Sequence, residues 1–326
     1  MKDFLSIIKQ PIESELQQFI TLFNEQLEHT DGTLQQALNH IKQRGGKRMR
    51  PMLVLLTAKL LGTITEETQR AGIGLEMLHT ATLVHDDIVD EADTRRGQAS
   101  VNAIYDNKIA VLVGDYVLST ALINVCGSHN LEIVKYLSTL GQVLSDGEIL
   151  QLTSNGSEKI SEEAYYEVIK KKTAALFEAS CAMGAMSVNA PMESVKKARL
   201  FGQQIGMIFQ IRDDIFDYYD DDVIGKPTGN DMQEGKLTLP AIHAVLTTDN
   251  KEMRDIAMKV KKFSATPDEI ARLVAFTKQN DGIEYAEQKM QEIHSQAMQY
   301  IENEVHDADL KEAFTAYLDY VIVREK

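Results

Sequence analysis

The chain has no tryptophan, only two cysteines, few prolines and a shortage of positive charge. Cys126 and Cys181 do not form a CxxC pair, so the sequence indicates no disulfide framework and is typical of a reducing cytoplasm. A net charge of −15 argues against non-specific binding to nucleic acid or to an anionic membrane. The same charge would repel an anionic substrate unless cations mediate the contact.

Proline and β-turn signals are also scarce. No proline lies between Pro51 and Pro191, and few Asn-Gly or Asp-Gly pairs stand between alternating apolar runs. Helical periodicity dominates instead, since Leu75, Leu78, Thr82 and Asp86 fall at spacings of three and four. We therefore expect an all-α protein. The apolar stretch 109–126 carries Asp115, which favours a buried helix over a membrane span.

The organisation of the chain indicates one domain. A length of 326 residues is compatible with about two domains. However, the predicted breaks near 45–46, 62–63, 127–130, 153–157, 189–191 and 225–240 lack the composition of an interdomain linker. We expect a single helical domain over residues 1–326. The N-terminus lacks the apolar core of a signal peptide, so we expect a cytoplasmic protein.

Two DDxxD motifs stand in apolar sequence, within LVHDDIVDEADTRRG and IRDDIFD. On a helix, acids at this spacing crowd one face and repel each other. Mg²⁺ is the natural countercharge, because it takes hard carboxylate oxygens and keeps positions for water and phosphate. Their apolar flanks predict that these acids line an internal cavity. The predicted metal ligands are Asp86, Asp87, Asp90, Asp213, Asp214 and Asp217.

Other interpretations of the acids are weaker. A solvated acidic face is the simplest alternative for one cluster, but two clusters in apolar surroundings argue against it. The adjacent pair His85–Asp86 resembles part of a His-Asp phosphohydrolase site, yet the other histidines form no matching array. No DxDxDG run is followed by the glutamate that an EF-hand requires.

Basic residues accompany the acids in four places. RGGKRMRP places Lys47 and Arg50 after two glycines, which let backbone approach an anion. Arg95 and Arg96 follow the first acidic motif. The remaining groups are KKKT, with Lys172 and Thr173, and GKPTGNDMQEGKLTLP, with Lys226 and Lys236. Each group alone is compatible with surface charge, whereas together they indicate a site for two polyphosphates.

These motifs make the sequence similar to the trans-prenyl diphosphate synthases. GGKRMRP, HDDIVDEADTRRG, KKTAALFEA, FQIRDDIFDY and GKPTGNDMQEGKLTLP occur in the order of that family, over roughly residues 15–326. The runs LHTATLVHDDIVDEADTRRGQASVNA and DGEILQL most resemble long-chain bacterial enzymes of the octaprenyl type. The resemblance implies the isoprenoid synthase fold, a large single-domain helical bundle around a central cavity, in a homodimer.

The resemblance also implies roles for individual residues. It implies two to three Mg²⁺ ions per site, with Asp86, Asp90 and Asp213 as the most direct ligands. Residues implied to bind isopentenyl diphosphate are Lys47, Arg50, His79 and Arg96. Those implied to surround an allylic diphosphate, farnesyl or similar, are Arg95, Lys172, Thr173, Gln210, Lys226 and Lys236. The basic C-terminal VIVREK resembles a tail that approaches the site.

The implied reaction is a head-to-tail condensation. The carbon–oxygen bond of the allylic diphosphate breaks, the isopentenyl double bond attacks the cation, and a proton is lost. Mg²⁺ and the cations Arg95, Lys172 and Lys236 stabilise charge on the departing diphosphate, which is the expected base. The catalytic residues expected from this scheme are Asp86, Asp87, Asp90, Arg95, Lys172, Asp213 and Lys236.

Product length is predicted from two small residues. Ala81 and Thr82 lie about one turn before Asp86, where a bulky aromatic in this family stops growth early. We expect a long product, with octaprenyl as the central expectation, for the side chain of a quinone. The alternatives are a geranylgeranyl or farnesyl synthase, a terpene cyclase-like relative, and one subunit of a heteromeric synthase. We expect at most peripheral membrane contact.

Overall fold

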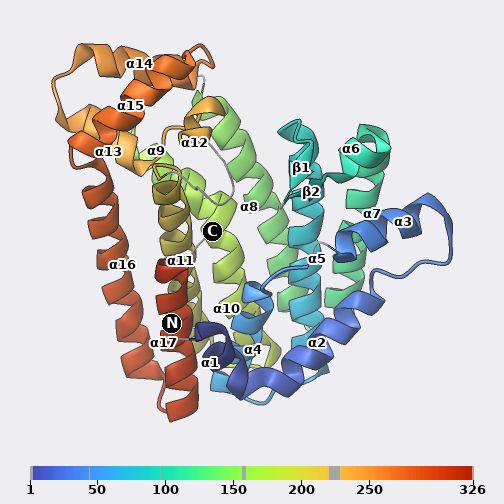
Figure 1. Cartoon of the computed structure of the whole chain (residues 1–326). Helices are drawn as coiled ribbons and strands as arrows, with labels where there is room; N and C mark the ends of the chain where they lie inside the picture. Colours follow the sequence, from blue (N-terminus) through green and yellow to red (C-terminus); the bar gives the residue numbers. More distant parts are fainter. Residues whose placement is uncertain (1–2, 44, 96, 156–158, 220–227, 325–326) are drawn as a thin grey trace. The chain divides into compact units, whose positions relative to one another are not determined.

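The part of the chain that the structure describes is all-α except for one short hairpin, which confirms the predicted class (Figure 1). The computed structural model describes residues 3–43, 45–95, 97–155, 159–219 and 228–324. By their internal contacts these residues form two compact units. Unit 1 comprises residues 1–141, 176–202 and 305–316, and unit 2 comprises residues 142–175, 203–304 and 317–326. The predicted single domain over 1–326 stays a prediction.

Unit 1 contains most of the N-terminal half. Its complete elements are α1 (Phe4–Lys9), the 3₁₀ turn η1 (Gln10–Ile12), α2 (Glu13–Glu25), α3 (Gly32–Gln43), α4 (Met49–Leu61), α5 (Glu66–Val89), β1 (Thr94–Arg95), β2 (Gln98–Ala99), α6 (Val101–Tyr105) and α7 (Asn107–Cys126). The core of this unit is apolar and closely packed. Met52, Leu53 and Leu56 on α4, for example, are entirely buried.

Unit 2 contains the second acidic motif. Its complete elements are α9 (Glu162–Ile169), the π-helix η2 (Lys170–Ala174), α12 (Asn230–Gln233), α13 (Leu239–Thr247), α14 (Lys251–Lys261), α15 (Pro267–Gln279) and α16 (Gly282–Glu304). Four helices contribute residues to both units: α8 (Leu131–Asn155), α10 (Ala175–Ser187), α11 (Met192–Phe216) and α17 (Ala308–Val323). The predicted breaks at 45–46, 62–63, 127–130 and 189–191 all fall between helices.

Helix α7 packs along α5, and the prediction that it is a buried helix is only half correct. Gly114 on α7 lies against the ring of His85, a contact that any Cβ would block. The opposite side of α7 is open, since Leu112 is 66% exposed and Ile123 is 68% exposed. Among the described residues, α7 is the helix whose length and composition would allow it to cross a membrane.

The hairpin β1–β2 was not predicted. It pairs Thr94 with Ala99 and Arg95 with Gln98, and Gly97 has a φ of +74° at its turn. A positive φ is easy for glycine because it has no Cβ. The hairpin follows the first acidic motif directly and turns the chain back, which directs Arg95 toward Asp87.

Candidate active site

The three acids of the first motif lie at the C-terminal end of α5, in three different environments. Asp86 is half-buried, Asp87 is completely buried and Asp90, which caps the helix, is exposed. The guanidinium of Arg95 pairs with the carboxylate of Asp87. The accessible carboxylates are therefore those of Asp86 and Asp90, while Asp87 orients the arginine of the hairpin.

Arg48 and Arg50, the two arginines of the segment 45–50, contact different side chains. Arg48 adopts a left-handed backbone with φ of +54° and pairs with Glu76 at 3.2 Å. Arg50 is the second residue of α4, and its Nη1 is 3.0 Å from Nε2 of His79. The structure thus brings together Arg50 and His79, two of the predicted isopentenyl diphosphate residues. Lys47 is exposed in the segment just before α4.

Two other sequence predictions concern α5. Ala81 is buried, and Thr82 is half-buried with its hydroxyl donating to the carbonyl of His79 at 2.9 Å. Thr82 therefore satisfies its polar atom within the helix.

His85 turns away from Asp86 toward α7, where Nε2 lies 3.3 Å from the carbonyl of Val111, so nothing supports a phosphohydrolase pair.

The second acidic motif spans the end of α11, and each acid again has its own partners. Asp213 pairs with Arg324 at 2.9 Å. Asp214 accepts from the hydroxyl of Tyr165 at 2.5 Å and from the amide of Gln210 at 2.8 Å. Asp217 accepts from the backbone N–H groups of Asn230 and Asp231, at 3.0 and 3.1 Å.

These contacts correct the expectation that the acids of each motif share one face. Adjacent residues on an α-helix point about 100° apart, so the first two acids of DDxxD diverge. Asp86 and Asp213 remain accessible, whereas Asp87 and Asp214 turn into the protein and are buried. Each doublet therefore has one partly exposed acid and one buried acid that accepts internal hydrogen bonds.

Lys172 and Thr173 lie in a π-helical turn, Lys170–Ala174. Such turns are rare in proteins, and those that occur often lie at functional sites. Two glycines make room for it. A Cβ on Gly147 would stand 2.8 Å from Cβ of Lys171, and one on Gly206 would stand 2.4 Å from Cα of Ala174. The widened turn is thus held between the backbones of α8 and α11.

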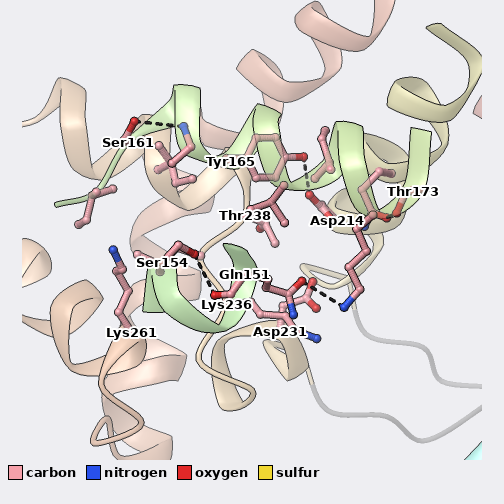
Figure 2. A pocket seen from close by; sticks show the side chains of 18 of the residues that line it. Gln151, Ser154, Ser161, Tyr165, Thr173, Asp214, Asp231, Lys236, Thr238 and Lys261 are labelled. Carbon is pink, nitrogen blue, oxygen red and sulfur yellow. Dashed lines mark hydrogen bonds between the residues drawn. The ribbon is translucent and has the colours of Figure 1, made fainter. Parts of the chain in front are cut away.

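The π-helix opens into a cavity of about 370 Å³ within unit 2 (Figure 2). Four of the predicted allylic diphosphate residues line it: Lys172, Thr173, Gln210 and Lys236. Lys172 pairs there with Glu148 at 2.6 Å, and Lys236 with Glu234 at 2.6 Å. Apolar side chains such as Ile169, Leu237 and Ile242 complete the walls. The cavity therefore joins cationic groups to an apolar surface.

Burial dominates the electrostatics of this cavity. It raises the pKa of Asp214 well above its usual value, and the nearby charge of Asp231 acts in the same direction. Burial, followed by the charge of Asp217, raises the pKa of Asp231 to about 7. Burial also raises the pKa of Tyr165, so its hydroxyl keeps its proton. A cation bound near these acids would favour their charged forms.

Several contributors escaped the sequence analysis. Glu148 and Gln151 lie on α8, and both contact Lys172. Tyr165 and Asp231 line the cavity, and Asp231 also bonds through its backbone to Lys236 at 2.7 Å. Glu148 and Gln151 lie in DGEILQL and Asp231 in GKPTGNDMQEGKLTLP, both noted as motifs, but a role for Tyr165 has no local signal. Arg96 and Lys226 lie outside the described residues.

The described residues contain no group of three or more His, Cys, Asp or Glu side chains placed to hold a metal ion. Each unit contains one of the acidic motifs. The predicted set of metal ligands therefore stays a prediction.

The sequence profile of the family described as polyprenyl synthetase matches residues 31–277. The chain belongs to this family. It is a polyprenyl diphosphate synthase, a trans-prenyltransferase. All-trans-nonaprenyl-diphosphate synthase (geranyl-diphosphate specific) of Rhodobacter capsulatus is 34% identical over 302 residues, 92% of each chain. Octaprenyl diphosphate synthase of Escherichia coli (strain K12) is 38% identical over 222 residues, 68% of this chain and 69% of the relative.

Solved structures of the family confirm the isoprenoid synthase fold. Geranylgeranyl pyrophosphate synthase from Bacteroides thetaiotaomicron is 47% identical, with a TM-score of 0.87 over 99% of this chain and 100% of that one. Polyprenyl synthase from Caulobacter crescentus CB15, complexed with calcium and isoprenyl diphosphate, is 26% identical. Its TM-score is 0.90 over 98% of each chain. The relatives differ in the product length that their names give.

Proposed function

We propose that this polyprenyl synthetase condenses isopentenyl diphosphate with an allylic diphosphate to make a long all-trans polyprenyl diphosphate. One observation carries the proposal. Lys172, Thr173, Gln210 and Lys236, predicted independently of the structure, line one cavity with apolar walls. This combination suits a ligand with an anionic head and a hydrocarbon tail, because the lysines meet the phosphates and the walls meet the chain.

The chemistry follows from where charge develops. The allylic carbon–oxygen bond breaks, and the diphosphate leaves with the electron pair. The isopentenyl double bond then supplies the electrons of the new carbon–carbon bond, and a proton passes to the departing diphosphate. Lys172 and Lys236 stabilise the leaving group more strongly as its charge grows, which lowers the barrier. Arg50 and His79 orient isopentenyl diphosphate.

Mg²⁺ is the proposed cofactor, because the predicted ligands are carboxylates. Asp86, Asp90 and Asp213 present hard carboxylate oxygens and are the accessible acids of their motifs. Two to three bound ions would neutralise the diphosphate. In its support, a related polyprenyl synthase was crystallised with calcium and isoprenyl diphosphate.

The metal proposal has a direct test. Asp86→Ala should lower kcat by about 10²–10³-fold, the usual effect of removing one electrostatic stabiliser. Asp93→Ala removes a nearby exposed acid and is the matched control. Near-normal turnover of Asp86→Ala at saturating Mg²⁺ would refute the metal role.

The long product is proposed from the small side chains at Ala81 and Thr82, with octaprenyl as the central expectation. A growing chain needs apolar space, and each buried methylene contributes roughly 0.8 kcal/mol to its binding. The names of the octaprenyl and nonaprenyl relatives agree with a long product. The competing candidate is a geranylgeranyl product, favoured by the 47% identity to the Bacteroides thetaiotaomicron enzyme.

The proposed assembly is a homodimer through the open side of α7. Val111, Leu112, Leu122 and Ile123 expose apolar surface there, each at least 40% exposed. Large apolar side chains gathered on one exposed side of a helix are typical of an interface. A Leu112→Asp variant should shift the mass in light scattering from dimer to monomer, while Leu200→Asp, on a different exposed leucine, should not. A monomeric wild-type chain would contradict this assembly.

A single assay tests the activity and the product length together. The purified chain is incubated with Mg²⁺, farnesyl diphosphate and labelled isopentenyl diphosphate, and the products are sized. Products near the octaprenyl length support the proposal, and a single added unit favours the geranylgeranyl alternative. Absence of elongation by the chain alone favours a heteromeric enzyme that needs a partner subunit.

A further inference from the structure

Tyr165 carries a buried hydroxyl that no proposed step uses. The residue lies on α9 and is 8% exposed. Its hydroxyl donates to Oδ2 of Asp214 at 2.5 Å, and both residues line the cavity that contains Lys172 and Lys236 (Figure 2). A hydrogen bond to a carboxylate in a low-dielectric site is strong, and its loss leaves a buried oxygen without its donor.

This bond is the first in a row of hydrogen bonds that ends at the predicted allylic diphosphate site. Oδ1 of Asp214 accepts from Nε2 of Gln210 at 2.8 Å. Oε1 of Gln210 in turn accepts from the hydroxyl of Thr173 at 2.7 Å. The sequence of groups is therefore phenol, carboxylate, amide and hydroxyl, with Tyr165 at the end farthest from Thr173.

This row of hydrogen bonds decides which way the side-chain amide of Gln210 points. An amide has a donor end and an acceptor end, and only the donor end can face Asp214 in its ionised form, which a bound cation favours. The NH₂ group has a second hydrogen, which this orientation leaves for a ligand oxygen. The reversed amide would offer its carbonyl oxygen in that place, where it would repel a diphosphate.

We propose that Tyr165 is a positioning residue for prenyl transfer, acting through Asp214 to keep the amide donor of Gln210 in place for the allylic diphosphate. This inference rests on the proposed function. It also gives the second acid of the DDxxD motif a task of its own. Asp214 orients protein donors, while Asp213 is the accessible acid.

Tyr165→Phe tests the proposal, because it removes the hydroxyl and keeps the ring. We expect KM for the allylic diphosphate to rise about tenfold. KM for isopentenyl diphosphate should stay within about twofold, because Arg50 and His79 lie in the other compact unit. Tyr166→Phe is the control, since Tyr166 precedes the same π-helix but does not line the cavity.

The possible outcomes separate the two proposals. Unchanged kinetics of Tyr165→Phe, or equal rises in both KM values, overturn the positioning role. If the wild-type chain, alone or with its partner subunit, elongates no allylic diphosphate, the proposed function itself fails. A working wild type beside an unaffected variant leaves the function standing and removes only the role of Tyr165.

A second variant guards against a folding defect in the first. Asp214→Asn places an amide where the carboxylate was; when its oxygen keeps accepting from the hydroxyl of Tyr165, its NH₂ group faces that of Gln210 and reverses the preferred orientation. We expect the same selective rise in KM for the allylic diphosphate. The double variant Tyr165→Phe/Asp214→Asn should be no worse than Asp214→Asn alone, because both act on one amide. Additive losses would show that Tyr165 does not act through Asp214.

Discussion

Arg324 lies 2.9 Å from Asp213, although 111 residues separate them in the chain. The side chain of Arg324 is 11% exposed, and its guanidinium stacks 3.9 Å from the ring centre of Phe209. Nη2 of Arg324, which donates to Asp213, also donates to the carbonyl of Phe209 at 3.2 Å. A C-terminal cation thus supplies countercharge to the accessible acid of the second motif.

Replacing Arg324 by glutamine should lower the thermal midpoint of the metal-free protein. Asp213 is 45% exposed, so solvent screening limits the loss to about 1 kcal/mol, or about 2 °C. Saturating Mg²⁺ should shrink the difference, because the bound cation replaces the lost charge. Calorimetry in EDTA and in Mg²⁺ measures both values.

The control is Arg272→Gln, which breaks an exposed pair with Glu252 on the surface. Equal midpoints for Arg324→Gln and the wild type in EDTA would contradict the countercharge role.

Lys172→Gln should weaken binding of the allylic diphosphate selectively. The ammonium lines the cavity beside Glu148 and Gln151, where a diphosphate would become its stronger partner. We expect a rise of about tenfold in KM for the allylic substrate and a fall in kcat of about 10²-fold, because the lysine also stabilises the leaving group. Steady-state kinetics with each substrate varied separately measures these effects.

The adjacent Lys171→Gln is a close control. Lys171 pairs with Asp146 at 2.8 Å and does not line the cavity. Equal losses in the two variants would mean that the general charge of KKKT, and not the π-helical placement of Lys172, matters.

Asp231 should make the metal-free protein less stable as pH rises. Its pKa is about 7 in the folded protein and 3.8 without burial, so the folded state holds an extra proton between these values. Stability contributed by this proton is present below pH 4 and is lost as pH rises toward 7, by up to about 4 kcal/mol. Urea unfolding in EDTA at pH 5 and pH 7.5 measures the change.

Asp231→Asn removes this contribution. We subtract the free energy of unfolding of the wild type from that of the variant at each pH. This difference should be more positive at pH 7.5 than at pH 5. The exposed Asp255→Asn is the control, and the same pH dependence in Asp231→Asn and the wild type would refute the assignment.

Ala81→Phe should shorten the product. If Ala81 borders the path of the growing chain, the phenyl ring fills that path and costs little stability. If it is merely close-packed, the ring strains the core by about 1–3 kcal/mol and leaves the product unchanged. Product sizing together with chemical unfolding distinguishes the two cases, and a full-length product from a destabilised variant would end the chain-length proposal.

The sequence predicted the helices and the kinds of residue at the site well. Breaks such as 127–130 follow from helix-ending residues, and the basic and acidic motifs have spacings that are visible without coordinates. The hairpin at 94–99 was missed because its two-residue strands carry no alternating pattern. Tyr165 was missed because nothing local in EEAYYEVIK distinguishes it from Tyr166.

By itself the sequence determined that this protein is helical, that it carries two acidic doublets, and that lysines and arginines accompany them. Only the tertiary structure decided which acid of the second doublet meets which partner. Asp213 and Asp214 are neighbours in the chain, yet a helix turns them about 100° apart. One then meets Arg324 and the other meets Tyr165, residues 111 and 49 positions away. Contacts at such separations depend on how the helices pack, which local spacing does not encode.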